Sequence, residues 1–136
     1  MSYETERVLI ETTLKAGAVS ASIPVQYPNA PLQPTDGTGF VRLSILGGQG
    51  SLSAVVGASS PTRHPGVIDL AIFRPRNAGG KPVRDWADTL AGILANKSLT
   101  SGTVRILTFT PRLDVIGESG DWFQANLSVP FVRDDN

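Results

Sequence analysis

Few residues in this sequence of 136 residues have types that could perform chemistry. His64 is the only histidine and there is no cysteine, which excludes disulfides, thiolate zinc sites and cysteine nucleophiles. A histidine-based metal site would need carboxylates at ligand spacing, and the sequence does not gather them. The run of Arg, His, Pro and Gly at 63–66 predicts a turn before a strand. We therefore expect no metal site and no catalytic role for His64.

Two glycine-rich segments begin like active-site motifs but do not complete them. Residues 117–121 (GESGD) lack the last glycine of a nucleophile elbow, which joins a strand to a helix, whereas this segment lies between two predicted antiparallel strands. Residues 48–53 (GQGSLS) begin like a dinucleotide-binding loop, but Ser53 stands in place of the third glycine. The dipole of a predicted helix explains the carboxylates of Asp85 and Asp88. The sequence therefore predicts a protein that is not an enzyme and has no cofactor.

Charge is balanced in number but segmented along the chain. Twelve Lys and Arg residues match twelve Asp and Glu residues, so the chain as a whole has no general attraction for nucleic acid. The net charge is −1 over residues 1–62, +4 over 63–84 and −3 over 85–136. The basic residues of the middle segment are Arg63, Arg74, Arg76, Lys81 and Arg84, and the acidic residues gathered towards the C-terminus are Asp114, Glu118, Asp121, Asp134 and Asp135.

The segmented charge has two interpretations. One is scattered, solvated charge. The other is that the two groups meet between identical subunits, in head-to-tail contacts that generate rings. Trp122 favours the second interpretation, because it shares parity with the polar Gln124 and Asn126 in its predicted strand, and tryptophan is enriched at interfaces. The alternative for Trp122 is cover by the N-terminal helix or by a loop.

Two helices are predicted to position these residues. The first has about 14 residues, with Ser2 as its N-cap, Gly17 as its stop and an apolar stripe that includes Tyr3, Ile10 and Leu14. The second covers residues 82–96, because Pro82 suits the first helical position and apolar residues follow at helical spacing.

The first half of the chain is otherwise predicted as strands and loops. Residues 24–29 indicate a strand fragment, and 40–46 a half-buried strand with Val41, Leu43 and Ile45 on its core side. Residues 47–62 are predicted as a flexible hairpin or loop, in which a strand at 51–56 would pair with the preceding strand. The nearly continuous apolar run at 67–73 predicts a strand covered on both faces.

The C-terminal third is predicted as strands at 103–109, 113–116 and 122–132. Phe123, Ala125, Leu127, Val129 and Phe131 share one face of the last strand. Pro130 predicts that this strand lies at a sheet edge or leaves the sheet there, and residues 134–136 are expected to form a frayed tail. Together the elements predict a single α+β domain over residues 1–136, with two helices packed on a mainly antiparallel sheet.

The N-terminal segment lacks the basic and apolar regions of a signal peptide, and no stretch approaches about 18 apolar residues. Since cysteine is also absent, we expect a protein that is made and kept in a reducing cytoplasm and does not enter a membrane.

Several segments together resemble the phage tail terminator-like proteins of the lambda type, which are small proteins of siphophages and prophages. In chain order they are YETER at 3–7, VQYPN at 25–29, FVRL at 40–43, RHPGV at 63–67, GESGDWFQ at 117–124 and VPF at 129–131. The resemblance follows nearly the whole chain, but residues 47–60 match nothing in it. It implies an α+β protein without catalytic residues.

The resemblance also implies a function and partners. Such proteins cap the growing tail tube as a hexameric ring, end addition of the major tail tube protein and present a surface for the head. It therefore implies contacts with further copies of this chain, with the tube protein and with a head–tail connector protein, first in the host cytoplasm and then in the virion tail. Two alternatives stay open: a head–tail neck component, and a small anion- or nucleic-acid-binding module that uses the basic segment.

Overall fold

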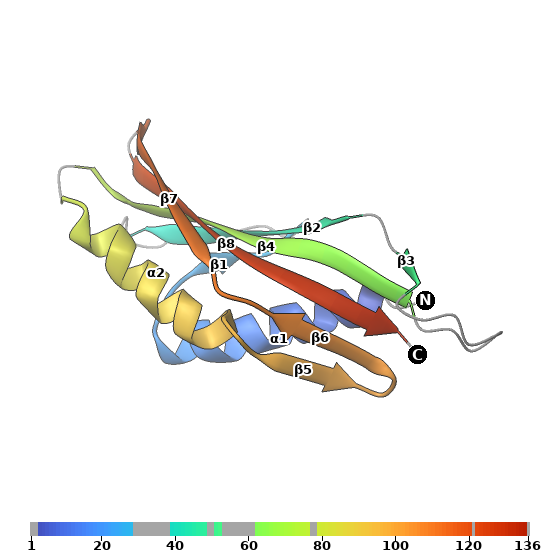
Figure 1. Cartoon of the computed structure of the whole chain (residues 1–136). Coiled ribbons are helices and arrows are strands. Elements are labelled where there is room, and N and C mark those ends of the chain that lie inside the picture. The colour runs from blue at the N-terminus through green and yellow to red at the C-terminus, as the bar shows by residue number, and fades with distance from the viewer. Residues whose placement is uncertain are drawn as a thin grey trace.

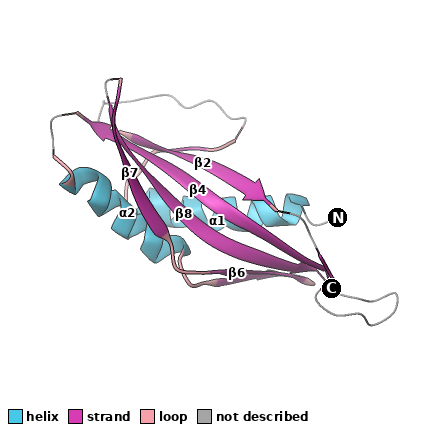
Figure 2. Cartoon of the chain, turned by 45° about the horizontal axis from the view of Figure 1, so that its top comes forward, coloured by secondary structure: helices cyan, strands magenta, loops and turns pink. Residues whose placement is uncertain are grey.

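The computed structural model describes residues 3–28, 39–48, 51–52, 62–76, 79–120 and 122–135. Within them, two helices lie on the same side of one curled mixed sheet, which confirms the predicted α+β class (Figures 1 and 2). In chain order the elements are α1 (Tyr3–Ser20), β1 (Val25–Gln26), β2 (Phe40–Gly47), β3 (Ser51–Leu52), β4 (Thr62–Pro75), α2 (Lys81–Leu94), β5 (Ser98–Ser101), β6 (Val104–Thr108), β7 (Arg112–Ser119) and β8 (Trp122–Asp135).

The two longest strands, β4 and β8, form the centre of the sheet. The strand order is β1-β2-β4-β8-β6-β5, with β3 beside β4 and β7 beside β8. β1 and β2 are parallel, and the other pairs are antiparallel. β4 and β8 pair from Thr62↔Asp135 to Pro75↔Trp122. At about 3.3 Å per residue, the 14 residues of each strand place the two ends of this ribbon far apart.

The core lies between the helices and the inner face of the sheet. Alternate strand residues are buried there against one apolar stripe from each helix. Val41 and Leu43 are buried as predicted, and Ile45 is half-buried. The other fully buried residues include Ile68, Leu70, Ile72, Ile106 and Val129 from the sheet and Ile10, Leu14, Val83, Leu90 and Leu94 from the helices.

α1 is longer than predicted, because Gly17 lies inside the helix and does not end it. A Cβ atom on Gly17 would lie 2.5 Å from Cγ1 of Ile93, so the glycine allows α1 to approach α2 closely. Ile10 and Leu14 of the predicted stripe are fully buried, whereas Tyr3 is 60% exposed.

β4 is longer than predicted, and the helices cover only one of its two faces. Residues 63–66 pair with β8 and so belong to the strand, where a turn was expected. Ile68, Leu70 and Ile72 are buried on the inner face, while the residues between them are only half-buried. The expected cover on both faces is therefore wrong for the described chain, because both helices lie on one side of the sheet (Figure 2).

The sequence predicts that residues 40–46 and 51–56 pair with each other as a hairpin, and this prediction is wrong. β3 pairs with Thr62 and Arg63 of β4, and β2 pairs directly with β4. Residues 49–50 and 53–61 lie outside the described residues, so a flexible loop there stays a prediction, as does Ser2 as the N-cap of α1.

Pro130 lies inside the sheet and not at its edge. Its carbonyl oxygen accepts a hydrogen bond of 2.9 Å from the backbone N–H of Phe109. The nitrogen and the carbonyl of one strand residue point to the same side, so the proline nitrogen faces residues 109–111, between β6 and β7. Neither β6 nor β7 pairs with β8 at Pro130, so the missing N–H of the proline removes no hydrogen bond between paired strands.

The expected frayed tail is also wrong over the described residues. β8 continues to Asp135 and pairs there with both β4 and β6. Asp134 is only 7% exposed, and Asn136 lies outside the described residues.

Candidate assembly interface

β4 separates the predicted basic residues into two groups. Arg63 is the second residue of this strand, and Arg74 lies eleven residues further on, which corresponds to about 36 Å. Arg76 and the first turn of α2, with Lys81 and Arg84, follow the Arg74 end. We call this the turn end, because the β7–β8 turn also lies there, and we call the Arg63 end the C-terminal end.

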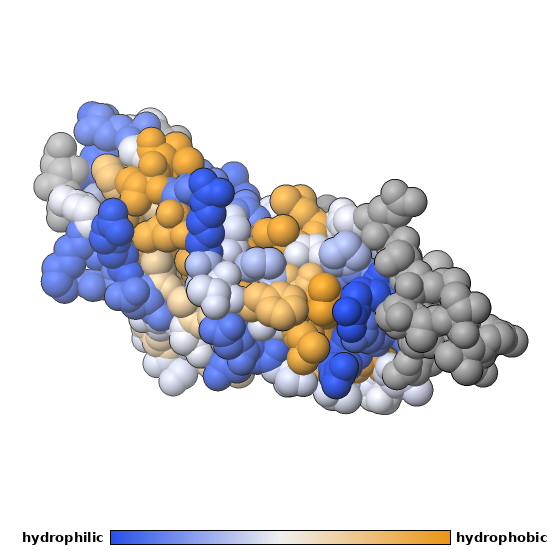
Figure 3. Space-filling view, viewed as in Figure 1, coloured by the Kyte–Doolittle hydropathy of each residue, from blue (hydrophilic) through white to orange (hydrophobic). Residues whose placement is uncertain are grey.

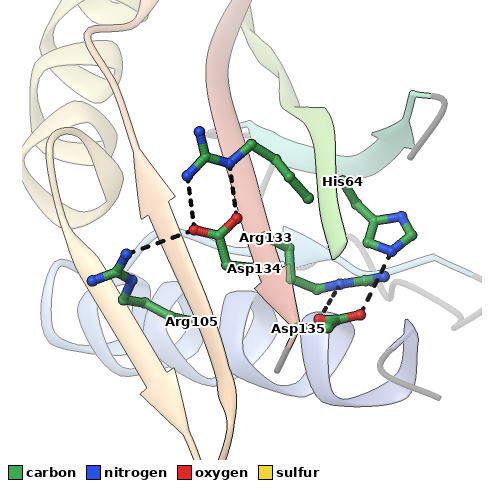
Figure 4. A network of polar contacts seen from close by, with 6 residues as sticks. His64, Arg105, Arg133, Asp134 and Asp135 are labelled. Carbon is green, nitrogen blue, oxygen red and sulfur yellow. Dashed lines mark hydrogen bonds and ion pairs between the residues drawn. The ribbon is translucent and has the colours of Figure 1, made fainter. Parts of the chain in front are cut away.

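At the C-terminal end, Asp134 of β8 contacts arginines from both neighbouring strands, β4 and β6 (Figure 4). Arg63 donates to its carboxylate from Nε at 2.8 Å and from Nη2 at 3.1 Å, and Arg105 of β6 lies 3.6 Å away. The hydrogen bond from Arg63 holds the pKa of Asp134 below its ordinary value, although burial acts in the opposite direction. Arg63 is thus paired within its own chain.

Arg133 is a buried cation that connects β8 to α1. Its side chain is 1% exposed, and it donates to Glu6 at 3.1 Å and to Asp135 at 3.0 Å. Its guanidinium lies 4.9 Å from the ring centroid of Tyr3. Burial raises the pKa of Glu6 more than the nearby Arg133 lowers it.

His64 belongs to the same network. Its Nε2 lies 3.6 Å from Oδ2 of Asp135 (Figure 4). Its ring meets the ring of Tyr3 edge-on, with centroids 6.1 Å apart. The contacts of His64 are therefore those of a residue that helps to hold the ends of α1, β4 and β8 together.

The turn end contains a second set of charges. Arg76 donates to Glu118 and to the carbonyl of Gly120, each at 3.1 Å. Lys81 pairs with Asp85 at 2.8 Å, which raises the pKa of Lys81. All these side chains are at least 42% exposed, so the pairs contribute little to stability.

Arg74 and Arg84 supply further positive charge at the turn end. The guanidinium of Arg74 lies 4.2 Å from the ring centroid of Trp86, and its buried Nε has no hydrogen-bond partner in the described chain. Arg84 is exposed on α2, where no ion pair with another described residue is found. The described turn end therefore keeps an excess of positive charge.

Trp122 lies at the start of β8, opposite Pro75 of β4. It is half-buried, and its ring meets Phe40 of β2 edge-on with centroids 5.6 Å apart. Phe40 in turn stacks on Phe73 at 4.7 Å. Trp122 thus joins an aromatic cluster on the outer face of the sheet.

Two predicted acidic residues remain to be placed. Asp114 lies on β7 and pairs with Arg112 at 3.1 Å. Asp121 lies outside the described residues, so its role stays a prediction. Sequence reasoning missed Glu6, Arg105 and Arg133, although Arg133 has the parity of the inward-facing residues of its strand.

Within the described ranges, no three His, Asp or Glu side chains are grouped so that they could hold a metal ion. None of the helices described is long and apolar enough to cross a membrane.

Comparison with known proteins gives a family and a shared fold. A family model described as phage tail terminator protein matches residues 7–131. A solved structure without a functional description aligns with 98% of this chain and 96% of its own, with a TM-score of 0.78 and 14% identity. A chain from the virion of a native gene transfer agent particle aligns with 96% of this chain and 94% of its own, with a TM-score of 0.57 and 18% identity. No curated protein matches.

Proposed function

The chain belongs to the phage tail terminator family, and from this premise we propose that it caps the tail tube as a ring, ends tube polymerisation and provides the surface to which the head docks. The observation that carries the proposal is the match of the family model over residues 7–131, which include most of both helices and most of the sheet. The fold shared with a chain of a virion particle also supports a structural role in a particle.

The ring is hexameric in this proposal, and its partners are further copies of the chain, the major tail tube protein and a head–tail connector protein. The protein acts first in the host cytoplasm and then in the virion tail, of a phage or of a prophage. It needs neither a catalytic group nor a cofactor for this task.

The turn end is our candidate for contact with one of these partners. Arg76, Lys81 and Arg84 are exposed there, Arg74 adds a further cation, and Trp122 lies at the same end of the sheet. Such a surface fits an acidic surface on the tube or on the connector. Arg63 contributes less in this proposal, because Asp134 already pairs with it.

Electron microscopy of purified protein mixed with polymerising tail tubes tests the function. We expect a ring at one end of each tube and an arrest of elongation. Tubes that stay uncapped and continue to grow would refute the proposal. A monomer in dilute solution would not, because the tube can act as the template for the ring.

A deletion in the phage distinguishes a terminator from a neck component. Loss of a terminator leaves headless tails of abnormal length, whereas loss of a neck component leaves tails of normal length. Binding to single-stranded or duplex DNA at low salt would instead favour the module that binds nucleic acid.

A further inference from the structure

The outer face of the sheet, on the side away from the helices, changes in composition along its length (Figure 2). The alternate residues of β8 on this face are Gln124, Asn126 and Ser128 towards the turn end, and Pro130 and Val132 towards the C-terminal end. A sheet face that stays in solvent is normally polar. The change from polar to apolar residues therefore gives the second part of this face the composition of a contact surface.

β4 and β6 continue the apolar part on either side of β8. On β4, Val67 and Pro65 are opposite the proline and the valine of β8. On the other side, Leu107 is opposite the same valine, and the backbone N–H of Phe109 donates to the carbonyl of the same proline. Residues that are opposite each other in a sheet share a face, so these side chains form two rows over three strands. We call them the outer array: Pro65, Val67, Leu107, Phe109, Pro130 and Val132.

The outer array is open to solvent. Pro65, Phe109 and Pro130 are exposed, and its other three members are half-buried. Leu46 of β2, which is opposite Val67, extends one row and is 57% exposed. Figure 3 shows hydrophobic surface over this part of the sheet, beside a hydrophilic strip towards the C-terminal end. Proline and valine side chains have little rotamer freedom to lose, so covering the array costs little conformational entropy.

Opposite charges lie at equal distances on the two sides of the outer array. On β4, Asp69 lies two residues beyond the array towards the turn end, and Arg63 lies two residues beyond it towards the C-terminal end. Arg63 and Arg105 share the single carboxylate of Asp134, so their row keeps one positive charge. Asp69 accepts a hydrogen bond from Ser128 at 3.3 Å, and no ion pair with another described residue is found for it.

This arrangement suits a two-fold axis that lies between two copies of the sheet and crosses the strands at Phe131. Face-to-face sheets pack with their strands within about 30° of each other. Around such an axis the two rows of one outer array cover the two rows of the other, and the row of Arg63 faces the row of Asp69. Arg112, which is in the row of Asp69, is already paired with Asp114 of its own strand. One surface is thus complementary to itself, as an isologous contact requires.

We propose that the outer array binds the outer array of a second copy of this chain, with Asp69 of each subunit approaching Arg63 and Arg105 of the other. From Arg63 to Asp69 the surface spans about 20 Å along the strands and about 14 Å across three strands. This outline is smaller than a standard interface of roughly 800 Å² per partner. We therefore expect a weak dimer, formed at protein concentrations on the order of 100 μM and above. The dimer needs no tail tube, so this inference does not rest on the proposed function.

Sedimentation equilibrium of the full chain, without tail tubes, tests the dimer. Phe109→Lys places a charge in the outer array and should weaken dimerisation at least tenfold. Val8→Lys is the matched control, because Val8 is also 44% exposed but lies on α1, on the other side of the sheet, and should leave dimerisation unchanged. A protein that stays monomeric up to about 1 mM, or an equal effect of the two variants, would overturn the proposal.

Ile116 provides a second control. It is 56% exposed and is the extra residue of a β-bulge, because Val115 is opposite Ala125 and Gly117 is opposite Gln124. It lies outside the outer array, so Ile116→Lys should also leave dimerisation unchanged. Loss of the dimer in this variant would place the contact on β7 and overturn the proposal.

Cysteine cross-linking locates the contact, because the chain has no cysteine of its own. In a two-fold contact, each residue near the axis approaches its own copy, so Phe109→Cys alone should give a covalent dimer with a short bismaleimide. Thr89→Cys, exposed on α2, should give none. A head-to-tail contact does not bring Phe109 to its own copy, so absence of the Phe109→Cys product in a dimeric sample would overturn the two-fold arrangement.

Asp69→Asn tests the charges, because it keeps the shape of the side chain and removes its charge. We expect dimerisation to weaken at least threefold, and added salt to weaken the unmodified dimer more than the variant. Equal dimerisation of the variant and the unmodified protein would overturn the contact between Asp69 and the arginines. Tube capping is measured separately, so failure of the dimer and failure of the proposed function are distinguishable.

Discussion

Arg63 and Asp134 lie 71 positions apart, yet Nε and Nη2 of the arginine donate to the two carboxylate oxygens of the aspartate at 2.8 and 3.1 Å. The register of β4 and β8 places these two residues opposite each other. They come from the basic and the acidic groups whose opposite charges suggested contact between subunits. At the C-terminal end, the complementary charge of the sequence therefore contributes to strand pairing within one chain.

The Arg63–Asp134 pair makes stability dependent on pH. Because the folded pKa of Asp134 lies below its ordinary value of 3.8, the carboxylate stabilises the fold fully above this value and loses its contribution as pH falls through the folded pKa. We expect Asp134→Asn to lower the free energy of unfolding by about 1–3 kcal/mol at neutral pH and to reduce its decline in acid. Urea unfolding of both proteins between pH 7 and pH 2.5 measures this.

Glu6 must be controlled in that experiment, because its pKa shift has the opposite sign. Its folded pKa is raised above 4.5, so its contribution is present below 4.5 and is lost as pH rises through the folded value. Comparing Asp134→Asn in a Glu6→Gln background isolates Asp134. An acid decline that is the same with and without Asp134→Asn would contradict the role of the pair.

Arg133 is expected to be one of the most sensitive polar positions. Arg133→Ala leaves the carboxylates of Glu6 and Asp135 without their cation in a buried setting, and should lower the free energy of unfolding by about 3–5 kcal/mol. Adding Glu6→Gln should recover part of this loss, with a coupling of about 1 kcal/mol or more in a double-mutant cycle. Strictly additive effects in urea unfolding would show that the two side chains do not depend on each other.

Two helical glycines should respond oppositely to alanine. Gly17→Ala places a methyl group where Ile93 lies, so we expect it to lower the free energy of unfolding by about 1–3 kcal/mol despite alanine's better helix propensity. Gly92 has nothing within 4 Å of an added Cβ, so Gly92→Ala should raise the free energy of unfolding by about 0.5–1 kcal/mol. Thermal unfolding of the two variants checks this, and a stabilised Gly17→Ala protein would show that α1 and α2 have room to separate.

The elements with strong periodicity were predictable from sequence. The α2 helix and the inward face of β8 follow the 3.6- and 2-residue patterns, because one face of each is buried. β5 was missed because its four residues are mostly exposed and so carry no alternation. Pro130 and Gly17 misled the prediction because a neighbouring element, and not the local sequence, explains each of them.

The candidate surfaces were only partly predictable. Charge type indicated one basic segment over residues 63–84, and four of its cations, Arg74, Arg76, Lys81 and Arg84, follow one another from the end of β4 into the first turn of α2. The sequence could not reveal that Arg63 lies about 36 Å from Arg74, because that separation comes from one continuous strand. The exposure of Ile116 was equally hidden, since the bulge depends on strand register.

The excess of positive charge among the described residues of the turn end predicts a specific loss of function on charge reversal. Arg74 is unsuitable for this test, because it packs on Trp86 and its reversal would disturb the fold. Arg84→Glu changes an exposed residue that has no ion pair among the described residues, so the free energy of unfolding should change by no more than about 0.5 kcal/mol. We expect at least a tenfold loss of tube capping, measured by electron microscopy. Lys97→Glu is the matched control, since it reverses an exposed charge beyond the other end of α2 and should cap tubes normally. Equal capping by the two variants would exclude Arg84 from the docking surface.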